Sequence, residues 1–156
     1  MLQNSITKRA MQFATGAIIA GAIMTHAQAA DALSVKLQAN QLVMQNGKPV
    51  LKAVTRANSG DVIQYSATYR NNIDKPMTNL AVTLPVPTSM VYIGEASPMP
   101  TLATLDGKTF EAIPIKRIIN GKEVQIPANQ YRAVRWVIPN LAAQQEATVS
   151  MNVKVR

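Results

Sequence analysis

Apolar and polar residues alternate along most of this chain with the two-residue period of a β-strand. In residues 62–70, the side chains of Ile63, Tyr65, Ala67 and Tyr69 fall on one face. This is the pattern of a strand that is buried on one side. The next segment is rich in turn formers, and after it residues 80–84 alternate again until Pro85. We therefore predict two strands separated by a turn.

The same pattern recurs at intervals of roughly ten residues. The further predicted strands are residues 33–38, 41–44, 50–54, 90–94, 102–105, 109–113, 116–119, 123–126, 131–138 and 146–155. Asn46-Gly47, Asp106-Gly107 and Asn120-Gly121 mark tight turns between some of them. No segment has a helical period, so the predicted fold class is all-β, and an immunoglobulin-like antiparallel β-sandwich is favoured.

The N-terminus has the pattern of a secretory signal peptide. Lys8 and Arg9 precede an uncharged segment over residues 10–25, and Ala27-Gln28-Ala29 supplies the small residues that a signal peptidase reads. A membrane anchor is the alternative, but a spanning helix needs roughly 20 apolar residues and this segment is shorter and rich in Ala, Gly and Thr. We predict a cleaved signal over residues 1–29, a single β-sandwich domain over residues 30–156, and an exported protein in the periplasm or at the cell surface. No membrane span is expected after cleavage.

The chain is basic, with a formal net charge of +8. Such a surplus favours anionic surroundings, and the solvated basic surface is the simpler interpretation because the cations are scattered. A candidate patch for anionic surface polymers is formed by residues that are close in sequence: Lys116, Arg117, Lys122, Arg132 and Arg135. No nucleic-acid motif accompanies them, so no specific nucleic-acid partner is predicted.

Two missing residue types restrict the chemistry of the exported domain. The only histidine is His26, which lies in the signal, and there is no cysteine. Imidazole and thiolate catalysis, Cys/His zinc sites and disulfides are therefore excluded. We predict no cofactor and no metal.

The acidic residues sit singly and mostly beside turns. A two-carboxylate glycosidase remains an alternative because such pairs meet only in three dimensions. Calcium binding is disfavoured because no Asp-x-Asp-x-Asp spacing exists. The prediction is that the protein is not an enzyme.

Several stretches appear in the order found in a known family, and the resemblance covers about residues 50 to 155. They are Gly60-Asp61-Val62-Ile63-Gln64-Tyr65, Tyr69-Arg70-Asn71, Asn79-Leu80-Ala81-Val82-Thr83-Leu84-Pro85, Val91-Tyr92-Ile93 and Arg135-Trp136-Val137-Ile138-Pro139-Asn140-Leu141. The chain resembles the bacterial conserved-repeat domain of unknown function that is number eleven in its series. The resemblance implies an immunoglobulin-like exported surface module with a structural or adhesive role and no catalysis.

The aromatic residues are expected to belong to the framework. Trp136 shares a strand face with Val134 and Ile138 and would bury a large area between two sheets, and the rings of Tyr65 and Tyr69 are also expected to be buried. The alternative is that Trp136 or Tyr92 is an exposed platform for carbohydrate stacking. A core that contains few aromatic residues is expected to claim them first.

The leading functional hypothesis is an exported non-catalytic structural or protein-interaction module of the bacterial cell envelope or surface. The second is a subunit of a pilus-like or fibre assembly that is joined by strand addition. Its candidate donor is the segment of residues 31–44, and the competing expectation is that this segment is the first strand of its own sandwich. A protein partner or self-association is predicted in either case.

Overall fold

A computed structural model describes residues 31–156, and the predicted signal peptide lies outside these residues. The regular structure in this part of the chain consists of strands and one short 3₁₀ turn, η1 (Ala128–Gln130), without any α-helix. The strands are β1 (Leu33–Gln45), β2 (Lys48–Ala53), β3 (Val62–Asn71), β4 (Met77–Pro85), β5 (Met90–Ser97), β6 (Leu102–Thr104), β7 (Glu111–Ala112), β8 (Lys116–Ile119), β9 (Lys122–Gln125), β10 (Ala133–Leu141) and β11 (Glu146–Val155). The all-β prediction is confirmed.

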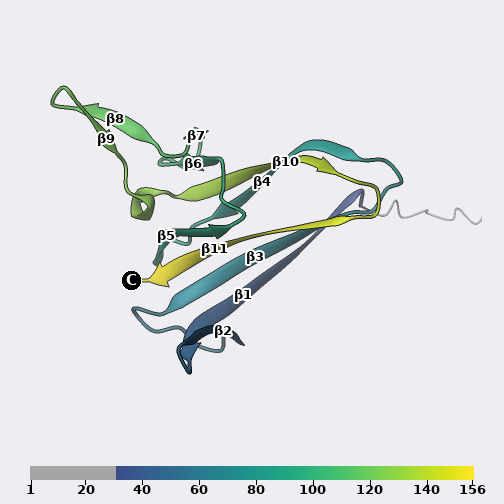
Figure 1. Cartoon of the computed structure of the whole chain (residues 1–156), viewed down its shortest axis with the longest axis horizontal. Coiled ribbons are helices and arrows are strands. Elements are labelled where there is room, and N and C mark those ends of the chain that lie inside the picture. The colour runs from purple at the N-terminus through teal and green to yellow at the C-terminus, as the bar shows by residue number, and fades with distance from the viewer. Residues whose placement is uncertain (1–30) are drawn as a thin grey trace, which may run out of the picture.

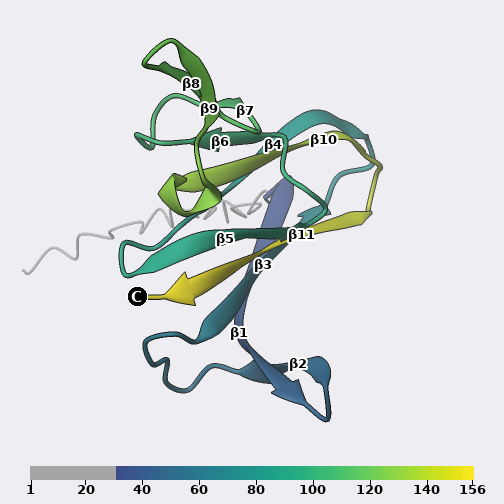
Figure 2. The same ribbon diagram turned by 60° about the vertical axis from the view of Figure 1, so that its left-hand side comes forward.

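The strands form two main layers, in which all pairs are antiparallel (Figure 1). The first layer, here called sheet A, has the order β2-β1-β3-β11-β5, and the second, sheet B, has the order β4-β10-β6-β7. Strands β8 and β9 form a separate hairpin that projects from the body of the molecule (Figures 1 and 2). This arrangement has the layers of a β-sandwich; the immunoglobulin-like assignment remains a prediction.

The core lies between the inner faces of the two sheets. Sheet A contributes one face of β3 and of β11, and sheet B contributes one face of β4 and of β10. The main buried side chains of these four strands are Ile63, Ala67, Tyr69, Val149, Met151, Val153, Val82, Leu84, Val134 and Trp136. The period-two pattern of residues 62–70 thus identified the buried face of β3 correctly.

Tyr69, Tyr92, Tyr131 and Trp136 belong to this core, whereas Tyr65, whose ring was expected to be buried, is only partly buried against it. Trp136 is buried and donates its indole N–H to the carbonyl oxygen of Pro98 at 2.7 Å, and the ring of Tyr92 is buried and stacks with that of Tyr131 at 6.3 Å between centroids. The alternative of an exposed stacking platform at Trp136 or Tyr92 is therefore wrong. These large rings fill much of the space between the sheets.

Two predictions about strand connections need correction. Residues 33–38 and 41–44 are one continuous strand, because Ala39 and Asn40 pair with Tyr65 and Gln64 of β3 without interruption. The strands β3 and β4 do not pair with each other, since the turn between them carries the chain from sheet A to sheet B. Alternation predicts a strand and its buried face, but it does not say which neighbour the strand pairs with.

Candidate functional site

The first half of β1 has a strand neighbour, β3, on one side only among residues 31–156. Strand β2 pairs with β1 only from Asn40 to Gln45, whereas β3 pairs with it from Leu33 to Leu42. Among residues 31–156, no strand lies beside residues 33–39 on the side away from β3. We call this segment the open edge of β1, and Figures 1 and 2 show β1 at the margin of the layer, with the short β2 beyond it.

The backbone groups of the open edge have a defined direction. The Asn72 N–H donates to the carbonyl oxygen of Ala32 at 2.9 Å, which fixes residues 32 and 72 as a hydrogen-bonded pair. Backbone groups point to alternate sides along a strand, so those of Leu33, Val35 and Leu37 point away from β3. Farther along β1, residues of this same parity face β2. The open edge therefore presents donors and acceptors of a strand that have no strand partner among residues 31–156.

The side chains of the same residues are apolar and exposed. Val35 and Leu37 are opposite the buried residues Tyr69 and Ala67 of β3, so they are on the inner face of sheet A. Nevertheless, Val35 is 49% exposed and Leu37 is 70% exposed. These side chains are exposed because sheet B ends at β4, so that no strand of residues 31–156 covers this part of β1.

An apolar groove continues from these side chains toward sheet B. Its volume is about 310 Å³, and it lies between the inner face of β1 and β3 and the end of β4. Its lining side chains are mainly apolar: Leu37, Ala39, Tyr65, Leu84, Pro85, Pro87 and Met151, with Gln38 and Ser66. The open edge and this groove together are here called the open side of the sandwich.

One cation marks the outer face of the open edge. Lys36 is exposed, and it is in none of the three ion pairs found among residues 31–156. Nearby on the same face, the guanidinium of Arg70 binds the carboxylate of Glu146 at 3.0 Å. Arg70 is thus compensated, and Lys36 carries the uncompensated charge at this edge.

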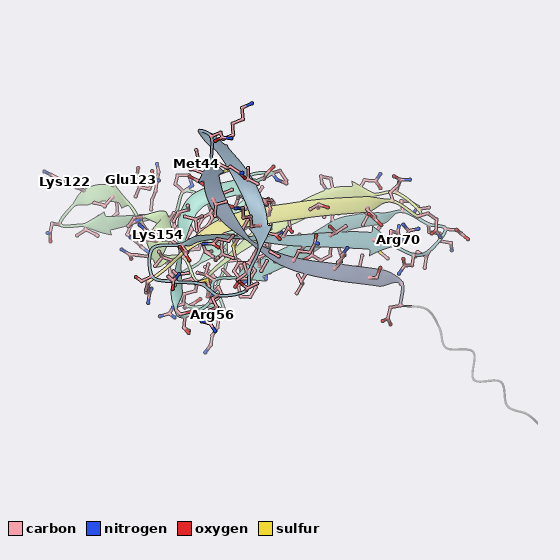
Figure 3. All side chains as sticks on the ribbon, turned by 90° about the horizontal axis from the view of Figure 1, so that it is seen from below. Met44, Arg56, Arg70, Lys122, Glu123 and Lys154 are labelled. Atoms are coloured by element: carbon pink, nitrogen blue, oxygen red, sulfur yellow. The ribbon has the colours of Figure 1, made fainter. Side chains whose placement is uncertain are left out.

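The structure brings only part of the predicted anionic-partner patch together. Lys116, Arg117 and Lys122 lie on the β8–β9 hairpin, and Figure 3 shows Lys122 at its far end, with Glu123 beside it. Lys116 binds Glu123 at 2.8 Å, and Arg117 binds both carboxylate oxygens of Glu111. These hydrogen bonds from Arg117 hold the pKa of Glu111 below its usual value. Two of the three cations on this hairpin are therefore paired.

The other two residues of that predicted patch belong to the body of the sandwich. Arg135 stacks on the ring of Phe110 at 3.5 Å from its centroid and donates to the hydroxyl of Thr83 at 2.9 Å. Arg132 donates to the carbonyl oxygen of Leu105 at 3.0 Å and lines a cleft of about 450 Å³ together with Arg156. Arg135 thus has partners within the fold, and binding of anionic polymers remains a prediction.

Sequence reasoning identified residues 33–38 as a strand but did not identify them as a binding edge. The alternation of Leu33, Val35 and Leu37 with polar residues predicts burial on one face, and it carries no information about how far sheet B extends. The one available hint was the tight Asn46-Gly47 turn, which fixes β2 as the hairpin partner of the later part of β1.

In comparisons with known proteins, no family model, no curated protein and no solved structure matches the chain. Within residues 31–156, no helix has the length and apolar character needed to cross a bilayer. In the same part of the chain, no three His, Cys, Asp or Glu side chains gather where they could hold a metal ion.

Proposed function

We propose that this protein is a non-catalytic structural or protein-interaction module of the bacterial cell envelope or surface, and that it binds through the open side. The observation that carries the proposal is the exposure of Leu37 and Val35 beside strand backbone that no other strand in the described part of the chain pairs with. Single exposed apolar residues are common on soluble proteins and need no explanation. Here the apolar side chains adjoin an apolar groove and a free edge, which is the combination found at binding surfaces.

The chemistry of the open side favours a protein partner over a small molecule. A small-molecule site is typically concave and surrounds most of its ligand. The open side combines an apolar groove with a strand edge whose donors and acceptors have a regular spacing. Another polypeptide matches this surface with both its backbone and its side chains. Export to the periplasm or cell surface belongs to the same proposal and is supported by the signal-like N-terminus.

The proposal is tested by substituting two apolar side chains that are equally exposed in the wild-type protein. Leu37 and Ile118 are each 70% exposed, but Leu37 lies at the open side and Ile118 lies on the β8–β9 hairpin. The full-length chain, Leu37→Ser and Ile118→Ser are each produced in the native cells and sized in gently extracted envelope fractions. We expect Leu37→Ser to shift from a larger assembly to the monomer and Ile118→Ser to behave as wild type. A wild-type chain that is itself monomeric in these fractions would contradict the proposal.

A fibre subunit is the second candidate function, because the open edge could receive a strand from a neighbouring copy. Residues 31–44 were the candidate donor, and in the structure they form β1, paired with β3 of the same chain. A fibre built from this donor thus requires β1 to leave its own sheet and enter that of another copy. Filaments or a ladder of oligomers in the purified full-length protein would support this candidate, and a single species at all concentrations would exclude it.

A further inference from the structure

We infer that the open edge of β1 receives one extended segment of another protein, antiparallel to β1 and in line with β2, with apolar side chains at alternate positions and an acidic side chain facing Lys36. This inference rests on the proposed function and specifies the binding mode and the chemistry of the partner. Three independent features support it: the direction of the backbone groups, the space beside β1, and the distribution of charge.

Along the whole length of β1, alternate residues direct their backbone N–H and C=O groups away from β3. The outward groups of Gln41 and Val43 face Lys52 and Val50 of β2, in the hairpin closed by the Asn46-Gly47 turn. The groups of Val35 and Leu37 point to the same side, because they have the same parity in the strand. Edge strands with unpaired groups are templates for strand addition. A segment beside residues 33–39 would therefore continue the hydrogen bonding that β2 begins.

The space beside the open edge is limited at one end by β2. That strand ends at Ala53, opposite Asn40, and the chain then turns toward β3. The incoming segment would occupy the position that β2 leaves vacant. Its residues opposite Val35 and Leu37 would lie on the inner face of sheet A, next to the apolar groove. Apolar side chains at these alternate positions would remove the exposed side chains of Val35 and Leu37 from water.

The charge of the open edge selects against a second copy of this chain. The backbone groups of two β1 strands match only when outward-facing residues meet one another, as in antiparallel registers centred on residue 35, 36 or 37. In each of these registers, Lys36 lies opposite or diagonal to Lys36 of the second copy. Like charges at such positions destabilise a strand pair, and an opposite charge stabilises it. An acidic residue of another protein is therefore the favoured neighbour of Lys36.

The first test measures binding of a synthetic peptide to the full-length chain by calorimetry. The probe is a nine-residue peptide that is blocked at both ends. It has valine at positions 2, 4, 6 and 8 and threonine at the other positions, except for a glutamate at the central position 5. A matched probe carries lysine in place of the glutamate. We expect the wild type to prefer the glutamate peptide, and Lys36→Glu to reverse the preference, by about two- to fivefold in each case. Equal binding of the two peptides by wild type and by Lys36→Glu would overturn the acidic part of the inference.

The second test blocks the backbone of the open edge. In Val35→Pro the lost N–H points away from β3, so the strand should remain paired within the chain while addition is prevented. We expect binding of the glutamate peptide to fall by at least about tenfold. A second readout in the wild type needs no variant: the peptide should slow hydrogen exchange of the Val35 and Leu37 amides and leave those of Lys36 and Gln38 unchanged. Undiminished binding by Val35→Pro, or protection of neither Val35 nor Leu37, would overturn strand addition.

These results separate the inference from the proposed function. If Leu37→Ser releases the chain from its envelope assembly while Val35→Pro still binds the peptide, the protein is an interaction module that does not use strand addition. If the purified wild type forms a dimer that Val35→Pro converts to a monomer, the occupant is a second copy, and the inference of an acidic partner is wrong.

Discussion

Asn71 joins the two layers of the sandwich at one of its ends through a single buried side chain. Its amide nitrogen lies 2.8 Å from the carbonyl oxygen of Lys75, 3.0 Å from that of Leu141 and 3.1 Å from that of Ala142, and its side-chain oxygen accepts the N–H of Ile73. The side chain is fully buried, so water cannot replace these partners. It therefore holds the turn after β3 against the turn after β10.

We expect Asn71→Ala to lower the free energy of unfolding by about 2–3 kcal/mol, since several buried groups lose their partner. The matched control is Asn72→Ala, because the amide of Asn72 binds an exposed carbonyl oxygen of Asp31. Its loss should cost about 1 kcal/mol or less. Urea denaturation followed by tryptophan fluorescence measures both values, and equal effects of the two substitutions would contradict this role of Asn71.

Tyr92 presents the opposite case, a buried hydroxyl without a hydrogen-bond partner among residues 31–156. Burial raises the pKa of this phenol above its usual value. In Tyr92→Phe the unsatisfied hydroxyl is removed and the ring stays, so the protein should become more stable by up to about 1 kcal/mol. Tyr131→Phe is the control, because its hydroxyl accepts the Ile115 N–H and donates to the Ile126 carbonyl oxygen. It should be destabilised, and a loss of stability in Tyr92→Phe would show that its hydroxyl has a partner.

Asp106 gives the fold an acid-sensitive turn. The backbone N–H groups of Lys108 and Thr109 and the hydroxyl of Thr104 all donate to its carboxylate, and they lower its pKa well below the ordinary value of 3.8. A carboxyl whose folded-state pKa is lowered stabilises the fold above its unfolded-state pKa. This stabilisation is lost as the pH falls below about 4 toward the folded-state pKa.

We therefore expect the wild type to lose more stability between pH 5 and pH 2 than Asp106→Asn, whose amide does not titrate. Thermal unfolding at a series of pH values measures the difference. Parallel profiles for the two proteins would show that the carboxylate of Asp106 does not contribute to acid sensitivity.

The two backbone sides of strand β1 differ, because the N–H groups of its even-numbered residues bind β3 and those of the odd-numbered residues of the open edge face away from β3. Proline at an even position would remove an N–H that binds β3, whereas proline at an odd position of the open edge removes one that faces solvent. We expect Lys36→Pro to lower the free energy of unfolding by about 3 kcal/mol or more, and Val35→Pro by about 1 kcal/mol or less. Chemical denaturation of the two variants measures this contrast. Similar losses would mean that the alternation of backbone groups along β1 is not as described.

Strands and tight turns are well predicted from the sequence where residues close in sequence determine them. Asn46, Gly47, Asn120 and Gly121 all adopt positive φ, as the tight turns that they mark require. Alternation likewise identified β11 from Glu146 to Val155, because each of its faces has one environment along its length. These features depend on neighbours in sequence and not on the arrangement of distant strands.

The arrangement of distant strands could not be predicted in the same way. Whether β4 pairs with β3 or crosses to the other sheet depends on long-range packing, and the turn residues permit both. The candidate site is of this type, since Leu37 is exposed only because sheet B ends one strand short of β1. The same alternation of apolar residues would be seen if a further strand covered it.

The unequal extents of the two layers of the molecule create the open side. Sheet A extends beyond sheet B by β1 and β2, and Figure 3 shows Met44 on the β1–β2 hairpin projecting from the body. Lys122 and Glu123 lie at one end of the long axis and Arg70 lies toward the other (Figure 3). The two sheets share one apolar core, whose residues come from both layers, and the open side adjoins this core.

Residue-resolved hydrogen exchange of the full-length protein alone shows whether residues 33–39 form an open edge. We expect fast exchange for the amides of Val35 and Leu37, slow exchange for those of Lys36 and Gln38, and slow exchange again for those of Gln41 and Val43, which face β2. Equal protection of Val35, Lys36, Leu37 and Gln38 would contradict this expectation, because the edge would then already be covered in the free protein.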